Sequence, residues 1–155
     1  MGSTFVVRIP LAPLNIPHAD QLHEVSSAKP LKGKKILAVD DMPSVLELLD
    51  SMLKNLGAQV ILASSAHQAI DLVKNESPDI LISDISMPGQ DGYELIREIR
   101  KLPQELGGRI PAIALSAHAD PVFEKKALES GYQLYLVKPS LVQSLVQSIK
   151  SVLAA

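Results

Sequence analysis

The chain contains no cysteine and no tryptophan, and only 3% of its 155 residues are aromatic. The absence of cysteine excludes disulfides, thiolate metal sites and a cysteine nucleophile, and it fits a reducing compartment. The shortage of aromatic side chains argues against stacking platforms for bases or sugars. No apolar run approaches the roughly 20 residues that span a bilayer, and residues 1–8 lack the pattern of a signal peptide. We therefore expect a cytoplasmic chain without membrane contact.

The charges are unevenly distributed along the chain. It carries 15 basic and 17 acidic residues, a net charge of −2. Up to residue 35 there are five basic and two acidic residues, whereas the remainder has ten basic and fifteen acidic ones. Such an acidic body lacks the basic face that collects phosphates, so we do not expect nucleic-acid binding. The hydrophobic share of 46% is sufficient for the core of one domain.

The composition divides the chain near residue 30. Residues 12–33 carry three prolines among polar residues without a sustained period, which is typical of a linker. Residues 1–11 include the β-like run Thr4–Leu11, and so short a segment holds no strand to pair with it. We expect the folded domain to span residues 34–155.

From Lys35 onward, short apolar runs alternate with stripes at helical spacing. Runs that are apolar throughout are typical of strands buried on both faces of a parallel sheet. They lie at 36–39, 60–62, 80–82, 110–115 and 134–137. The two longest stripes are Val45, Leu48, Leu49, Met52, Leu53 and Leu56, and Leu141, Val142, Leu145, Val146, Ile149 and Leu153. The alternation predicts a doubly wound α/β domain with five parallel strands. The predicted helix N-caps include Ser65, Asp91, Asp120 and Ser140.

Chemically active side chains follow the predicted strands. Asp40 and Asp41 follow the first strand, Asp84 the third, Ser116 ends the fourth and Lys138 follows the fifth. In an open parallel sheet the site lies beyond the carboxyl ends of the strands. Crowded carboxylates repel by about 4 kcal/mol per pair at 4 Å and an effective dielectric near 20, so they need a compensating cation or proton. Oxygen ligands favour Mg²⁺, beside which a carboxylate can attack phosphorus while an ammonium and a hydroxyl stabilise the phosphoryl oxygens.

Four motifs in this order resemble the receiver domains of two-component response regulators. They are Val39-Asp40-Asp41, residues 83–92 (SDISMPGQDG), residues 114–117 (ALSA) and residues 135–139 (YLVKP), and the resemblance covers about Lys35 to Leu153. It implies a flavodoxin-like (βα)5 fold with strand order 2-1-3-4-5.

The resemblance also implies roles for individual residues. Asp84 would accept the phosphoryl group. Mg²⁺, for which Mn²⁺ would substitute, would be held by Asp41, Asp84, the backbone carbonyl of Ser86 and, through water, Asp40. Lys138 would bind the phosphoryl group, and the bond between Lys138 and Pro139 would be cis.

Four further positions carry a switch or tuning role by the same resemblance. Ser116, where threonine is commoner, would bind the phosphoryl group while Tyr135 turns inward behind it. Ser86 and His118 occupy positions that tune phosphoryl lifetime. Taken alone, Tyr135 also fits plain edge packing and His118 an ordinary loop histidine. Ser140 departs from the apolar residue usual after the Lys-Pro pair.

Residues 2–11 resemble the last strand of the ATP-binding domain of histidine kinases. The order of strand, linker and receiver is that of a hybrid histidine kinase. The expected partners are a histidine kinase phosphodonor domain and a histidine phosphotransfer protein or downstream regulator, and a homodimer is one arrangement open to the chain. By itself the chain would catalyse only its own aspartyl phosphorylation and dephosphorylation.

Two other functions compete with phosphoryl acceptance. A phosphorylation-independent interaction domain on the same fold would normally lack an acid or the lysine, and all are present here. A phosphatase of the haloacid-dehalogenase type wants two aspartates one residue apart, whereas Asp40 and Asp41 are adjacent and point apart in an extended strand.

Overall fold

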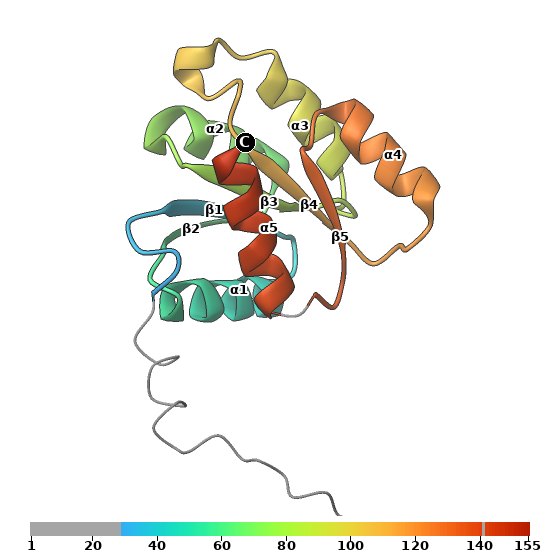
Figure 1. Ribbon diagram of the computed structural model, residues 1–155. Coiled ribbons are helices and arrows are strands. Elements are labelled where there is room, and N and C mark those ends of the chain that lie inside the picture. The colour runs from blue at the N-terminus through green and yellow to red at the C-terminus, as the bar shows by residue number, and fades with distance from the viewer. Residues whose placement is uncertain (1–28, 141) are drawn as a thin grey trace, which may run out of the picture.

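The structure is a computed structural model that describes residues 29–140 and 142–155 (Figure 1). Residues 1–11, predicted to be a kinase strand, and most of the predicted linker lie outside the described residues. Five parallel strands form one sheet in the order β2-β1-β3-β4-β5, which confirms the predicted flavodoxin-like topology. The elements are β1 (Lys35–Val39), α1 (Pro43–Asn55), β2 (Gln59–Ala63), α2 (Ala66–Glu76), β3 (Ile80–Asp84), α3 (Gly92–Arg100), the 3-10 turn η2 (Gln104–Leu106), β4 (Ala112–Ser116), α4 (Pro121–Ser130), β5 (Leu134–Val137) and α5 (Val142–Ala154).

Two apolar layers enclose the sheet, one on each face. Helices α1 and α5 cover one face, and α2, α3 and α4 cover the other (Figure 1). Along β1, Ile36 and Ala38 pack into the first layer while Leu37 and Val39 pack into the second. The alternation explains why this strand is apolar along its whole length, because both of its faces are buried. No helix among the described residues is long and apolar enough to cross a membrane.

Three of the predicted helix caps are present. The Ser65 hydroxyl accepts from the Gln68 N–H at 3.3 Å, and the Asp91 carboxylate accepts from the Glu94 N–H at 2.9 Å. The Asp120 carboxylate accepts from the Val122 N–H at 2.9 Å, so each cap satisfies a donor of the first helical turn. The fourth predicted cap, Ser140, precedes residue 141, which lies outside the described residues.

The structure corrects two details of the predicted pattern. Leu48 is 66% exposed although it belongs to the predicted apolar stripe, because the inward face of α1 is formed by Leu46, Leu49 and Leu53. The fourth strand begins at Ala112 and not at residue 110. Pro111 precedes it and has no N–H for the ladder, although its carbonyl accepts from Leu81 at 2.9 Å.

The folded unit extends upstream of the predicted boundary at residue 34. Leu31 is 1% exposed and packs with α1 and α5, and its N–H donates to the Leu56 carbonyl at 3.0 Å. The last residues of the predicted linker are therefore part of the packed domain, and they fix the point where the preceding chain arrives.

Candidate functional site

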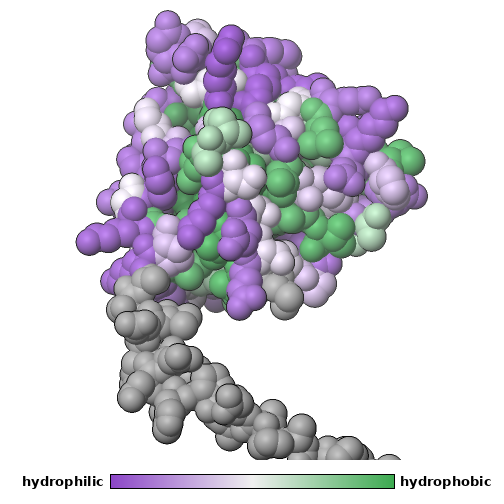
Figure 2. Space-filling model, in the orientation of Figure 1, coloured by the Kyte–Doolittle hydropathy of each residue, from purple (hydrophilic) through white to green (hydrophobic). Residues whose placement is uncertain are grey.

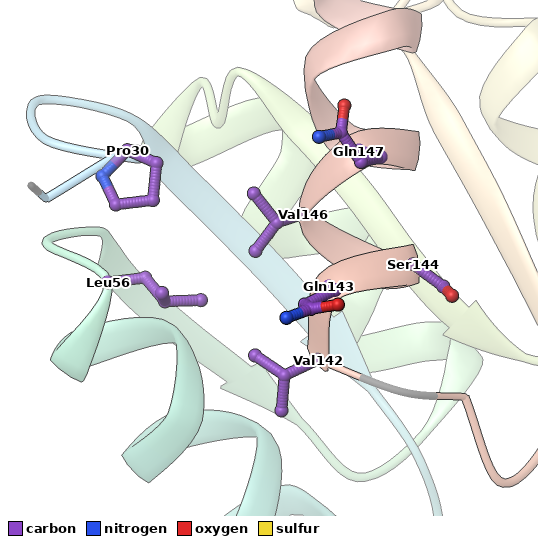
Figure 3. A pocket seen from close by; sticks show the side chains of 7 residues that line it. All are labelled: Pro30, Leu56, Val142, Gln143, Ser144, Val146 and Gln147. Atoms are coloured by element: carbon purple, nitrogen blue, oxygen red, sulfur yellow. The ribbon is translucent and has the colours of Figure 1, made fainter. Parts of the chain in front are cut away.

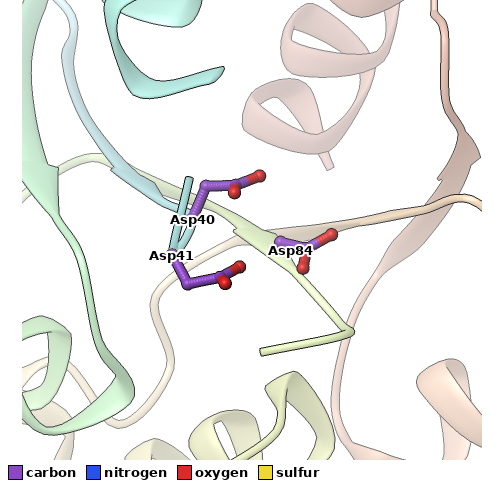
Figure 4. Close-up of side chains that lie close together, drawn as sticks. All are labelled: Asp40, Asp41 and Asp84. Atoms are coloured by element: carbon purple, nitrogen blue, oxygen red, sulfur yellow. The ribbon is translucent and has the colours of Figure 1, made fainter. Parts of the chain in front are cut away.

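Three carboxyl groups meet at the carboxyl end of the sheet. Asp40 and Asp41 directly follow β1, and Asp84 ends the neighbouring strand β3 (Figure 4). One oxygen of each lies within 4.8 Å of one oxygen of the other two. Asp40 and Asp84 are 1% and 6% exposed, while Asp41 is the most open of the three. Such a set of hard oxygen donors, with one member facing outward, fits a divalent cation that keeps several waters.

Lys138 joins two of these carboxylates. Its Nζ lies 2.7 Å from Asp40 Oδ2 and 2.8 Å from Asp84 Oδ1. The chain delivers it there from the end of β5, where the Lys138 N–H donates to the Ser116 carbonyl at 2.7 Å. The bond from Lys138 to Pro139 is cis, as predicted. The other oxygen of Asp40 accepts from the Met42 N–H at 2.9 Å, so this buried carboxylate is bonded through both oxygens.

The surroundings of Lys138 favour its charged form. Burial alone lowers the pKa of Lys138, but its hydrogen bonds to Asp40 and Asp84 and their negative charges outweigh burial and raise it above 10.5. The lysine is therefore an ammonium at neutral pH. One ammonium faces three carboxyl groups, so their ionised forms leave two negative charges for another cation to balance.

The predicted switch residues meet at the backbone of His118. Ser116 is fully buried, and its hydroxyl accepts from the His118 N–H at 3.1 Å. The Tyr135 hydroxyl donates to the His118 carbonyl at 2.6 Å. The His118 ring stacks on Phe123, with the ring centroids 4.5 Å apart. Sequence reasoning named Ser116, Tyr135 and His118 but missed Phe123, because an aromatic residue in the first turns of a helix carries no motif.

The loop after β3 is closed tightly against Asp84. The Gly92 N–H donates to the Ile85 carbonyl at 2.9 Å, and a Cβ on Gly92 would lie 2.5 Å from the Asp84 carbonyl oxygen. Only glycine fits this approach, which explains the glycine that ends the motif at residues 83–92. Ser86 lies exposed in this loop, two residues after Asp84. Its role as a carbonyl ligand stays a prediction.

Comparison with known proteins agrees with this geometry. The sequence matches the response regulator receiver domain over residues 36–150. It is 46% identical over 104 residues to an uncharacterised 14.6 kDa protein of Leptolyngbya boryana, covering 67% of this chain and 78% of that protein. It is 33% identical over 119 residues to the sensor protein GacS of Pseudomonas syringae, covering 76% of this chain but 13% of GacS.

A solved structure of a similar domain contains a metal ion. The receiver domain of the sensor histidine kinase PA1611 of Pseudomonas aeruginosa, with a magnesium ion in its active site cleft, is 32% identical and superposes with a TM-score of 0.72. The likeness covers 79% of this chain and 99% of that domain. The family match and the structural likeness thus agree over most of the chain. The chain belongs to the response regulator receiver domains of two-component signalling.

Proposed function

We propose that Asp84 is the phosphoryl acceptor of this receiver domain and that Lys138 and Ser116 hold the phosphoryl group on it. The observation that carries the proposal is the bridge from Lys138 to Asp40 and Asp84, at 2.7 and 2.8 Å. The bridge places a positive charge beside the Asp84 carboxylate, which is 6% exposed. A carboxylate beside a fixed cation is the arrangement that attack on phosphorus needs.

The carboxyl groups of Asp40, Asp41 and Asp84 are suited to hold Mg²⁺, because three oxygen donors converge within 4.8 Å. We assign Asp41 and Asp84 as direct ligands together with the Ser86 carbonyl, and Asp40 as a ligand through water. Mn²⁺ has similar ligand preferences and should substitute. The bound ion would supply positive charge for the phosphoryl oxygens.

In the proposed reaction an oxygen of Asp84 attacks the phosphorus of a phosphohistidine. The new P–O bond forms as the P–N bond breaks, and the imidazole nitrogen leaves with the electron pair. Lys138 already lies 2.8 Å from Asp84, so its ammonium can pair with a phosphoryl oxygen with little movement. The donor would be the phosphohistidine of a histidine kinase or phosphotransfer protein.

Phosphorylation would be transmitted through Ser116. Its hydroxyl accepts from the His118 N–H at 3.1 Å, and a turn towards the phosphoryl group would release that N–H. The Tyr135 hydroxyl donates to the carbonyl of the same residue, so the backbone N–H and the carbonyl of His118 would change partners together. Helix α4 begins three residues after His118, at Pro121, so the change would spread to the surface formed by α4, β5 and α5.

The architecture of the parent protein is a further part of the proposal. The chain spans 13% of the length of GacS, so a longer parent is consistent with the likeness. We assign residues 1–11 to the last strand of a kinase ATP-binding domain and residues 12–33 to the linker, whose end packs onto the receiver through Leu31. The parent would then be a cytoplasmic-facing hybrid histidine kinase whose receiver passes the group to a further histidine carrier or controls the kinase itself.

The test is phosphorylation by acetyl phosphate with Mg²⁺, read as intact mass. The wild-type chain should gain one phosphoryl group, and Asp84→Asn and a sample with EDTA should gain none. Asp71→Asn is the matched control, because Asp71 lies on α2 and its partner among the described residues is the exposed His67, at 3.7 Å. No gain by a folded wild-type chain, with another receiver labelled in parallel, would favour the phosphorylation-independent interaction domain.

A further inference from the structure

An apolar hollow lies between helices α1 and α5, on the face away from α2, α3 and α4. Pro30, Leu56, Val142 and Val146 surround it, and Gln143, Ser144 and Gln147 complete its lining (Figure 3). None of these seven side chains carries a charge. Apolar surface is also visible on the face that α5 crosses, between polar side chains (Figure 2). An occupant of this hollow would therefore be apolar, with polar groups at most along its edges.

The chain enters the folded domain at the rim of this hollow. Leu31 is buried and bonded to Leu56, which fixes Pro30 beside the end of α1. Lys29 packs against Gly57, since a Cβ on that glycine would lie 2.8 Å from the Lys29 Cβ. Both contacts hold the backbone against the end of α1. The chain therefore joins the folded domain beside this hollow.

We propose that the last part of the linker, residues 22–28, occupies the hollow through the side chains of Leu22 and Val25. These are the apolar side chains larger than alanine between Pro17 and Lys29. Val25 is five residues from Pro30 and Leu22 is eight, so fully extended chain would reach about 17 and 27 Å. The part of α5 that lines the hollow, Val142 to Gln147, extends about 9 Å, so both lengths exceed the stretch of helix to be covered.

Tethering makes this occupant more favourable than a free partner. A segment joined to its site by a few residues experiences an effective concentration in the millimolar range. Covering apolar surface contributes about 25 cal/mol for each Å² removed from water. Val142 is 45% exposed without a cover, so it has surface to bury.

The hollow adjoins the segment that carries Lys138, so a linker bound in it would contact the neighbourhood of the site. Val142 also lines a second apolar hollow together with Lys138, Pro139 and residues of α1. A linker resting on Val142 would therefore abut the segment that carries Lys138. It would fix how the receiver sits on the chain that precedes it, independently of phosphorylation.

The absence of cysteine allows a direct test by disulfide cross-linking of the full chain. The double variant Val25→Cys/Val146→Cys should form an intramolecular disulfide under mild oxidation. The control Val25→Cys/Val122→Cys places the second cysteine on α4 at a position that is 69% exposed. Its disulfide should form at least about tenfold more slowly. Equal rates would overturn the proposal. A disulfide between two chains would also overturn it and identify a second copy as the occupant.

A second measurement leaves the hollow itself unchanged. Leu22→Ser/Val25→Ser should speed amide hydrogen exchange in the first turns of α5 by several-fold, because the apolar cover is lost. The control Leu14→Ser/Ile16→Ser, in the same linker but farther upstream, should leave this exchange as in the wild type. Unchanged exchange in the Leu22 and Val25 variant would contradict the proposal. Neither test uses a phosphodonor, so failure here is separate from failure of the proposed phosphoryl acceptance.

Discussion

Lys138 Nζ lies 2.7 Å from Asp40 Oδ2, although the two residues are 98 positions apart in the chain. Asp40 follows β1 and Lys138 follows β5, so the contact crosses the carboxyl ends of the two strands between them. The side chain of Asp40 is 2% exposed and that of Lys138 26% exposed. The pair is therefore shielded from solvent and from screening by salt.

Removing the lysine charge should destabilise the domain. Lys138→Met leaves Asp40 and Asp84 without their shared cation, and we expect the free energy of unfolding to fall by about 2–4 kcal/mol in metal-free buffer. Urea denaturation followed by circular dichroism measures it. Lys125→Met is the matched control, since its 3.8 Å pair with Glu129 is exposed and should change stability by less than about 0.5 kcal/mol. Equal losses for the two variants would contradict a stabilising role for the bridge.

The stability that Lys138 contributes through its ion pairs should be lost at alkaline pH. The pKa of Lys138 is raised in the folded state, so its contribution is fully present below the ordinary lysine pKa of 10.5 and lost as pH rises through the folded value. We expect the stability difference between wild type and Lys138→Met to shrink above pH 10.5. The quantity to measure is the difference in stability between the two proteins. Burial also raises the pKa of Tyr132, so ionisation of Tyr132 at alkaline pH destabilises both proteins. A difference that grows with pH would refute this assignment.

The Tyr135 hydroxyl should order the loop between β4 and α4. Tyr135→Phe removes its 2.6 Å bond to the His118 carbonyl, and we expect faster amide exchange at residues 117–120 with a stability loss of about 0.5–1 kcal/mol. Tyr132→Phe serves as the comparison. It removes a buried 2.8 Å bond to the Gly92 carbonyl, which should cost about 1–3 kcal/mol yet leave the loop at residues 117–120 unchanged. Exchange mapped by mass spectrometry distinguishes the two.

Gly92 should resist substitution because of the atoms around it. Its Cβ would lie 2.5 Å from the Asp84 carbonyl oxygen and 2.8 Å from the Ile85 Cα. Both are backbone atoms, so Gly92→Ala must displace the segment carrying Asp84, with an expected loss of about 1–3 kcal/mol and slower labelling by acetyl phosphate. Gly89→Ala has open space around it and a φ of 83°, so about 1 kcal/mol and unchanged labelling are expected. Normal labelling of Gly92→Ala would show that Asp84 tolerates the shift.

The fold could be predicted from the sequence because two signals mark a strand, an apolar run and the polar residue that ends it. The strand Ile80–Asp84 is apolar over its first three residues, and the change to Ser83 and Asp84 marks both its end and the edge of the sheet. The alternation of strands and helices then restricts the topology, since crossovers between parallel strands are right-handed. Gathering Asp40, Asp84 and Lys138 at one edge was therefore predictable from their positions alone.

The remaining details depend on contacts that no periodicity encodes. Leu48 has the spacing of a core residue, but the rotation of α1 about its own axis is decided by how Leu46, Leu49 and Leu53 pack. Leu31 falls in the predicted linker because the segment around it has prolines among polar residues and no sustained period. The stacking of His118 on Phe123 is likewise a tertiary contact between a loop and a helix. Such contacts become visible only once the elements are placed in space.

The contact between Asp40 and Lys138 also bears on the order of events during synthesis. The ribosome delivers the carboxyl groups of Asp40 and Asp84 long before the lysine that bridges them, since β5 is the last strand of the sheet. Until then these acids have no neutralising partner from the chain and gain nothing by being buried together. A nascent chain that ends before β5 therefore carries no finished reactive centre, and the arrival of Lys138 after β5 supplies the charge that the acids lack.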